Sequence, residues 1–308
     1  MAYTDIDDPS AYFQNLLWTG NNTDGTALTF DGNSDMQPDF VWVKHRNGTG
    51  YHGLFDSVRG VTKRLHTNTT SAEGTVAESL QSFNSNGFTV GNNSEINGSS
   101  KNYVSWNWKT GTAFSNDASG TGIGSIDSAG SVNQDAGFSI VSYTGTGSNG
   151  TIKHGLNSAP STIIHKRLNS TSGWVVWHKS IGTNILELDG TGAAQGGSSY
   201  INGTVPTSSV FSVGTSGDIN ASGGTYIAYC FAEKKGYLKT GKWIGNGNNN
   251  GPFSFCGFKP AFILIKRTDV AKNWYINDNL RLGYNPSNPY LSPNLTATET
   301  GGTEINML

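Results

Sequence analysis

A short segment that occurs three times constrains the fold of this chain more than any other feature. The segment begins with proline, continues through mostly apolar and β-branched residues and ends with lysine, at 38–44, 160–166 and 260–266. Each copy follows an aromatic residue that stands two positions before a glycine: Trp18, Tyr143 and Trp243. Internal repeats of this kind are typical of a duplicated supersecondary unit. We therefore expect three homologous units in tandem.

The second halves of the first two units also match. Residues 88–91 return as 211–214, and residues 103–106 return as 226–229; both offsets equal 123, since 211 − 88 and 226 − 103 agree. The third unit has no counterpart of these segments in the sequence. We expect strands from another chain to complete its sheet, because an unfinished sheet exposes unpaired backbone groups. The alternatives are that its remaining strands pair differently or that the chain is a shortened one.

A further match places an aspartate three positions before an arginine in the first and third units. Asp56 and Arg59 correspond to Asp278 and Arg281, whereas the second unit has a different sequence in this stretch. Carboxylate and guanidinium groups at this spacing form strong, directional ion pairs. Because a reaction needs its groups at one site, a pair that occurs twice in equivalent places indicates a structural role. We interpret both as internal ion pairs that fix a loop.

Each unit has the pattern of antiparallel β-structure. The runs at 40–43, 163–166 and 262–265 are short, rich in β-branched and aromatic residues, and bounded by proline and glycine. Glycine accounts for 41 of the 308 residues, nearly twice the share of about 7% in an ordinary globular chain. Charged residues make up only 14%, against about 25% in such a chain. We predict an all-β protein of tandem antiparallel β-sandwich units, either jelly-roll or concanavalin-like.

The repeats also suggest domain boundaries. We expect an N-terminal arm at 1–16, with a short helix that begins at Asp8 and Pro9. The next divisions are a first sandwich unit at 17–111, a linker at 112–136, a second unit at 137–236 and an incomplete third unit at 237–308. The second and third units join tightly, so we expect them to pack as a rigid pair while the first unit swings on its linker.

Four aromatic residues are candidates for the sandwich cores. Trp42 and Phe262 lie in the repeated apolar runs, and Trp106 and Tyr229 occupy equivalent positions in the matching closing segments. Because tryptophan and tyrosine bury large areas, we place all four side chains in cores.

The motifs that carry chemistry in other proteins do not favour an enzyme here. Residues 145–150 satisfy the GxGxxG pattern, but the following sequence is not helical, so no helix terminus would hold a pyrophosphate. Glu187 and Asp189 share one face of a strand, as glycosidase acids can, yet their surroundings are those of an ordinary strand and turn. The histidines stand at spacings that match no zinc motif. We expect no catalytic residue, no cofactor and no metal site.

The two cysteines and the net charge argue against several kinds of binding partner. Cys230 and Cys256 lie in apolar runs, which favours two buried thiols in neighbouring strands over a disulfide or a metal pair. A formal net charge of −2 and the absence of a long apolar run argue against nucleic-acid binding and membrane insertion.

Four segments together resemble a repeated domain of virion and tail-fibre-like proteins of tailed bacteriophages from marine and freshwater bacteria. They are the repeated segment, Asp56-Ser-Val-Arg-Gly60, Asn68-Thr-Thr-Ser-Ala-Glu73 and Tyr103-Val-Ser-Trp-Asn-Trp-Lys109. The likeness covers about residues 17–308. The resemblance implies a non-enzymatic virion structural protein that assembles in the host cytoplasm. Its implied partners are other virion proteins, further copies of itself and host surface glycans.

Three roles remain open for such a protein. The first is a tail fibre or appendage that contacts the host surface. The second is a capsid decoration or head-fibre protein. The third, from a different class, is a glycan-degrading tailspike.

Overall fold

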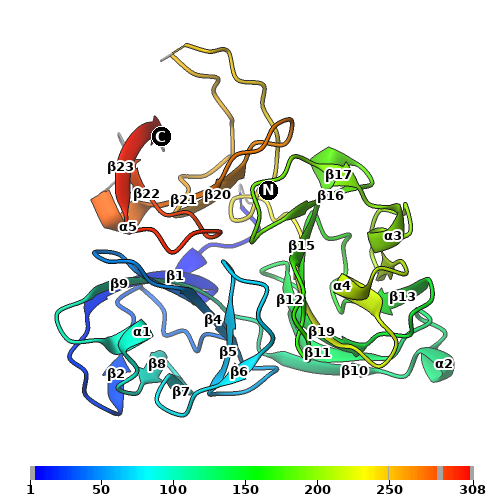
Figure 1. The fold of residues 1–308 in the computed structure, drawn as a ribbon, viewed down its shortest axis with the longest axis horizontal. Coiled ribbons are helices and arrows are strands. Elements are labelled where there is room, and N and C mark those ends of the chain that lie inside the picture. The colour runs from blue at the N-terminus through cyan, green and yellow to red at the C-terminus, as the bar shows by residue number, and fades with distance from the viewer. Residues whose placement is uncertain (1–3, 249, 283–286, 306–308) are drawn as a thin grey trace.

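The computed structural model describes residues 4–248, 250–282 and 287–305. It confirms the predicted all-β class, because antiparallel sheets account for most of the regular structure and its few helices are short. Figure 1 shows three groups of strands around a common centre, one for each repeat. None of the helices in the described part of the chain is long and apolar enough to cross a membrane.

The first unit consists of a six-stranded sheet and a smaller three-stranded sheet. The large sheet has the order β1 (Phe13–Thr19), β9 (Asn102–Trp108), β3 (Phe40–His45), β4 (His52–Asp56), β5 (Lys63–His66) and β6 (Gly74–Thr75). The small sheet has the order β2 (Thr26–Leu28), β8 (Gly87–Val90) and β7 (Leu80–Asn84), and α1 (Ser94–Asn97) follows it in the chain. These two sheets form a sandwich.

The second unit repeats this plan with an eight-stranded sheet and a two-stranded sheet. Its large sheet has the order β10 (Thr112–Asn116), β11 (Ser128–Asn133), β12 (Phe138–Thr144), β19 (Thr225–Phe231), β14 (Thr162–Arg167), β15 (Trp174–His178), β16 (Asn184–Glu187) and β17 (Gln195–Gly196). Its small sheet pairs β13 (Gly150–Lys153) with β18 (Val210–Val213). The short helices are α2 (Ala118–Thr121), η2 (Lys179–Ile181), α3 (Ser198–Ile201) and α4 (Gly217–Asn220).

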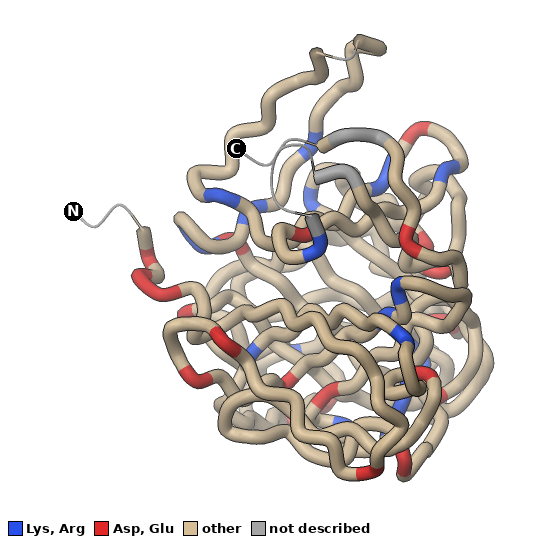
Figure 2. The backbone as a smooth tube through the Cα atoms, turned by 90° about the vertical axis from the view of Figure 1, so that its left-hand side faces the viewer, with Lys and Arg blue, Asp and Glu red and all other residues tan. Residues whose placement is uncertain are grey.

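The third unit contains two strand pairs and a long excursion. The pairs are β20 (Phe262–Lys266) with β21 (Trp274–Asp278), and β22 (Ser287–Tyr290) with β23 (Thr300–Ile305); α5 (Asn279–Leu282) follows β21. The chain from Lys239 to Pro260 forms no strand among its described residues and projects above the rest of the molecule (Figures 1 and 2). We call the stretch 239–260 the projecting loop.

The three units share one strand register. The first residue of each repeated strand lies opposite the last residue of the next strand: Phe40 opposite Asp56, Thr162 opposite His178, and Phe262 opposite Asp278. These pairings define which positions are equivalent. Asp56, His178 and Asp278 are therefore equivalent, and so are Trp42, Ile164 and Leu264 in the middle of the repeated strand.

The central strands of the first two units' large sheets, β3, β9, β14 and β19, are buried on both faces, which explains their nearly continuous apolar sequence. In β3, Val41 and Val43 face the core between the two sheets of the sandwich, whereas Phe40 and Trp42 face a second core. The alternation follows from the period of two residues in a strand. All six residues of β3 are buried, so this strand shows no polar alternation.

The second core is shared by all three units and lies where they meet. It contains Trp106 from the first unit, Tyr229 from the second and Ile276 from the third. Its aromatic contacts cross the unit boundaries, with ring centroids 4.8 Å apart for Phe40 and Tyr229 and 5.7 Å apart for Trp106 and Phe262. The first unit thus packs against both others, which differs from the expected swinging arrangement, because its large sheet needs this core to cover its second face.

The four aromatic residues singled out from the sequence all contribute to the shared core. Trp42, Trp106 and Tyr229 are fully buried, and Phe262 is half-buried at its edge.

Two sequence expectations about connections differ from the structure. The cap at Asp8 and Pro9 begins only a 3-10 helix at Pro9–Ala11, so the expected N-terminal helical arm is not formed. From Phe13 onward the chain is strand β1, since it pairs with β9 along its whole length and this tertiary pairing overrides local helix signals. Residues 112–136, expected as a linker, contain β10 and β11, which extend the second unit's large sheet.

A shared core predicts cooperative unfolding. We expect scanning calorimetry to show one transition for the whole chain, because unfolding any unit would expose the apolar surface of the other two. Two or more separate transitions would mean that the units are independent domains that merely touch.

Candidate functional site

The predicted pair Asp56 and Arg59 forms a buried ion pair at the end of β4. Arg59 Nε lies 2.5 Å from Asp56 Oδ2, and the two side chains are 3% and 0% exposed. Arg59 also reaches Glu73 at 3.1 Å and donates to the Leu54 carbonyl at 3.2 Å. Burial opposes the charged guanidinium, but Asp56 and the groups around it hold the pKa of Arg59 above its ordinary value. The arginine ties together β4, the following turn and the segment that carries Glu73.

The third unit repeats this arrangement with the other predicted pair. Arg281 Nε lies 2.6 Å from Asp278 Oδ2, and both side chains are fully buried. Arg281 also contacts Glu299 at 3.1 Å and donates to the Ile276 carbonyl at 2.9 Å. The equivalent sequence therefore produces an equivalent network.

Each buried carboxylate also accepts a hydrogen bond from a neighbouring unit. The Tyr229 hydroxyl of the second unit donates to Asp56 at 2.7 Å, and the Trp106 indole of the first unit donates to Asp278 at 2.9 Å. The structure thus brings the predicted ion pairs together with two of the predicted core aromatics. A buried carboxylate is tolerated only when its oxygens are paired and hydrogen-bonded, so these contacts join units.

Backbone hydrogen bonds repeat the same cyclic order at all three boundaries. Gly50 N–H donates to Thr296 O at 2.9 Å, Ser172 N–H to Thr70 O at 2.8 Å, and Lys272 N–H to Thr191 O at 2.9 Å. The first unit thus donates to the third, the second to the first and the third to the second. The three units therefore close into a ring with an approximate threefold relation.

The lysine that ends each repeated segment reinforces this ring. Lys44 Nζ donates to Thr296 O at 3.3 Å, Lys166 Nζ to Thr70 O at 3.0 Å, and Lys266 Nζ to Thr191 O at 3.2 Å. Burial lowers the pKa of both Lys44 and Lys166 to about 8. The sequence prediction did not include these lysines as contacts between units, although their place at the end of every copy of the repeated segment was the available signal.

The second unit departs from the others at its carboxylate position. His178 stands where Asp56 and Asp278 stand, and Ile181, three positions later, replaces the arginine. The His178 Nδ1 atom accepts a hydrogen bond from Ser180 N–H at 3.1 Å. This boundary therefore lacks the ion pair found at the other two.

The described residues form at least two surface hollows with partly polar linings. A depression of about 280 Å³ is lined by Tyr51, Arg64 and His66. The Tyr51 ring, 45% exposed, stacks on His66 at 4.4 Å, and Glu95 contacts His66 and Arg64, each at 2.7 Å.

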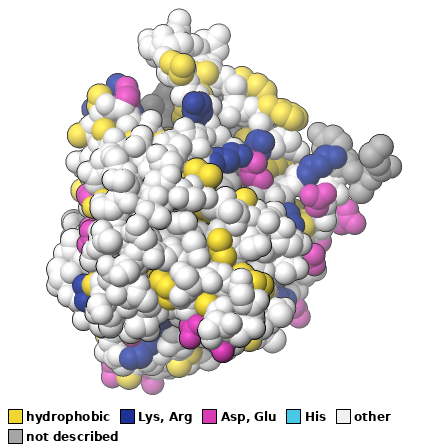
Figure 3. All heavy atoms as spheres, turned by 90° about the vertical axis from the view of Figure 1, so that its right-hand side faces the viewer, with side chains coloured by type: hydrophobic (Ala, Val, Ile, Leu, Met, Phe, Trp, Pro, Cys, Tyr) yellow, Lys and Arg dark blue, Asp and Glu magenta, His cyan; other side chains and the backbone are white. Residues whose placement is uncertain are grey.

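The second feature is an open groove of about 770 Å³ on the second unit. It is lined mainly by serine, threonine and aspartate side chains around Tyr143 and Tyr226. The face that the second unit dominates is largely uncharged and polar, with scattered apolar side chains (Figure 3). The basic and acidic residues are interspersed along the chain in the view of Figure 2.

The carboxylates and histidines considered as candidate site residues from the sequence make contacts typical of a structural role. Asp189 accepts from Trp174 N–H at 2.8 Å, and Glu187 accepts from Gln195 at 3.1 Å. Burial lowers the pKa of His154 to about 4 and that of His165 to about 3. In the described residues, no group of three or more histidine, cysteine, aspartate or glutamate side chains could hold a metal ion.

Both cysteines are free thiols, and only one lies in a strand. Cys230 is buried in β19, whereas Cys256 is half-buried in the projecting loop. The GxGxxG pattern at 145–150 spans the connection between β12 and β13 and ends at the first residue of β13, so it leads into a strand and not a helix.

The fold defines an all-β protein of three sheet units closed into a ring around a shared core. Residues 8–308 match the family described as Domain of unknown function (DUF7483), and the chain belongs to that family. No curated protein and no solved structure matches the chain.

The buried ion pair predicts a large effect of Asp56→Asn. We expect this change to lower the free energy of unfolding by about 3–5 kcal/mol, because it removes the fully buried counter-charge of Arg59 and leaves only the partly exposed Glu73 carboxylate beside it. Urea denaturation of both proteins measures the difference. The control is Asp269→Asn, which alters the exposed pair with Arg267 and should leave stability unchanged. A loss below about 1 kcal/mol for Asp56→Asn would contradict the structural role.

The buried lysines predict a stability that rises with pH. Above about pH 8 the folded protein releases the Lys44 proton, while the unfolded chain keeps it up to its ordinary pKa of about 10.4. The unfolded chain then binds more protons, so the free energy of unfolding increases between these values and is insensitive to this group below pH 8. Urea unfolding at pH 7.5 to 10 should show this rise in the wild type.

The variant Lys44→Met should reduce this rise, and the double variant Lys44→Met/Lys166→Met should remove most of it, because burial lowers the pKa of the remaining Lys266 as well. Lys272→Met alters an exposed side chain and should keep the wild-type pH dependence. An unchanged rise in the double variant would show that other groups cause it.

Proposed function

We propose that this chain is a non-enzymatic structural protein of a tailed-phage virion, as a component of a tail fibre or another appendage that contacts the host surface. The observation that carries the proposal is the use of its buried charged groups. Asp56, Arg59, Asp278 and Arg281 contact one another and neighbouring units, so their chemistry serves to hold the ring together. The resemblance of the repeated motifs to virion proteins supplies the setting.

The surface supports a binding role for the outside of such a particle. The exposed ring of Tyr51 lies beside His66 and Arg64, which combines an apolar face with hydrogen-bonding groups, as ligand sites generally do. Host surface glycans present both chemistries. The protein would join the particle in the host cytoplasm through contacts with other virion proteins and with further copies of itself.

A capsid decoration or head-fibre protein is the alternative role, and a glycan-degrading tailspike is a third. The alternative shares the structural chemistry and differs in position on the particle, while the tailspike would need acids free to act on a sugar. The carboxylates of Asp189 and Glu187, the pair singled out for that role, instead accept hydrogen bonds from their own unit.

Immunogold labelling of purified particles tests the position. We expect label on tail appendages and none on the capsid faces. Label confined to the capsid would replace the appendage assignment with the decoration role. Particles without any label, alongside a labelled known virion protein as control, would rule out a virion component.

Incubation of the purified protein with host surface polysaccharide tests the chemistry. We expect the polysaccharide to keep its chain length, measured by size-exclusion chromatography. Shortened chains that disappear after heat inactivation of the protein would favour the tailspike role.

A further inference from the structure

We propose that the outer edge of β20 is an acceptor site for a β-strand from outside the described residues, whose inward residues follow the aromatic pattern of β9 and β19. This site lies outside the role proposed above and does not depend on it. Four observations carry the inference: the unpaired edge, the exposed aromatic residue before it, a glycine contact absent from the third unit, and the place beside His178 that the cyclic order of the units gives to an added strand.

The edge of β20 is open where its two counterparts are paired. Strand β3 lies between β4 and β9, and β14 lies between β15 and β19. Strand β20 pairs with β21 on one side, and no described residue forms a strand on the other. An exposed edge presents unpaired N–H and C=O groups that can bind an added strand.

The direction of the backbone groups at this edge can be assigned. Asn279 N–H donates to Ala261 O at 3.2 Å, so odd-numbered residues of β20 hydrogen-bond to β21. Because bonding alternates along an antiparallel strand, the N–H groups of Phe262, Leu264 and Lys266 point to the open edge. In the first unit the even-numbered Arg46 accordingly donates towards β9, to Asn102 O at 2.7 Å.

Trp243 is exposed where its counterparts are stacked. Trp18 stacks on Tyr103 with ring centroids 5.2 Å apart, and Tyr143 stacks on Tyr226 at 5.1 Å. In both pairs the second residue belongs to the strand that pairs with β3 or β14. Trp243 is 51% exposed. An added strand with tyrosine at this position would cover its ring.

The glycine two positions after each of these aromatic residues differs between the units in the same way. A Cβ on Gly20 would lie 2.3 Å from Gly98 O, and one on Gly145 would lie 2.4 Å from Ala221 O. Both oxygens belong to the turn that leads into the strand beside β3 or β14, which is β9 in the first unit and β19 in the second. We call β9 and β19 the closing strands. A Cβ on Gly245 would meet no described atom within 4 Å apart from its own chain neighbours, so the third unit has no equivalent of this contact.

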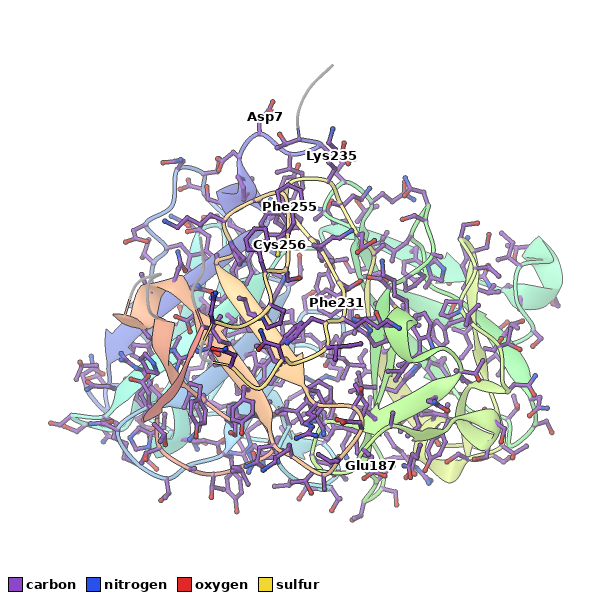
Figure 4. All side chains as sticks on the ribbon, turned by 90° about the horizontal axis from the view of Figure 1, so that it is seen from above. Asp7, Glu187, Phe231, Lys235, Phe255 and Cys256 are labelled. Carbon is purple, nitrogen blue, oxygen red and sulfur yellow. The ribbon has the colours of Figure 1, made fainter. Side chains whose placement is uncertain are left out.

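The open edge is continuous with the interface between units. The closing strands carry Trp106 and Tyr229 across a boundary, to Asp278 of the third unit and Asp56 of the first. In the same cyclic order, the residue that an added strand places opposite Leu264 would face His178 of the second unit. The projecting loop lies beside this region, and Figure 4 places Phe255 and Cys256 on it, with Phe231 of β19 further towards the centre.

The hydrogen bonding of His178 restricts which residue type can stand at the centre of the added strand. Its Nδ1 atom accepts from Ser180 N–H, so the other ring nitrogen, Nε2, carries the proton in the neutral ring and donates. A tyrosine hydroxyl can accept this hydrogen bond, whereas a tryptophan indole can only donate. The donor strand therefore has tyrosine at the centre, an aliphatic residue two positions before it and an aromatic residue two positions after it.

A synthetic peptide tests the site on the full chain. The probe copies residues 101–109 with Trp106→Tyr, and hydrogen exchange is followed by NMR at single amides. We expect the amides of Phe262, Leu264 and Lys266 to gain protection on binding, while Ile263 and Ile265 are protected with and without peptide. A control peptide with Tyr103, Trp106 and Trp108 all changed to serine should protect none of them.

Two further comparisons sharpen the result. The unmodified peptide with tryptophan at its centre should bind several-fold more weakly than the tyrosine probe. Trp243→Ala should weaken binding of the probe about three- to tenfold, the range expected for one aromatic pair, whereas Ile244→Ala, at an 89% exposed neighbour, should leave it unchanged.

Three outcomes would overturn the proposal. The first is an absence of protection at the even-numbered amides when the probe is in excess. The second is their protection in the protein alone at every concentration, which would mean that the edge is already covered. The third is protection that grows with protein concentration without peptide, which would assign the edge to pairing between two copies of β20.

Discussion

The apolar core between the three units is the constraint on which the remaining structure depends. Each large sheet has one face against its own small sheet and the other against this common core, so the central strands are covered on both faces. Burial of apolar area is the main favourable contribution to folding, and here it can be complete only when the units meet. The carboxylate and lysine contacts then set the order and orientation of the units, because each polar group buried at a boundary requires a specific partner.

The polar contacts differ in kind between the boundaries. Two boundaries use an aspartate with an arginine behind it, and the third has His178 with the apolar Ile181 in its place. A buried ion pair adds orientation more reliably than stability, since the cost of removing charges from water offsets much of their attraction. The Asp–Arg networks therefore specify how the first unit meets its neighbours, while backbone and lysine contacts, present at all three boundaries, are common to the ring.

The β class, the repeated strands and the buried aromatic residues could be predicted from the sequence, because each depends on local periodicity. The pairs Asp56 with Arg59 and Asp278 with Arg281 could be found for the same reason, since their members lie three positions apart. The predictions of an N-terminal helix and of a linker at 112–136 were wrong. At both places the chain joins a sheet whose other strands are remote in sequence: β1 pairs with β9, and β10 and β11 extend the sheet of β12.

The sequence by itself determined that this chain forms antiparallel strands in repeated pairs, and it marked the residues that would be buried. Only the tertiary structure decided that the sheets would be covered on both faces, that the units would close into a ring and that Tyr229 would meet Asp56. Those two residues are 173 positions apart. A contact of that range depends on the placement of whole sheets, and no local pattern of residue types encodes such a placement.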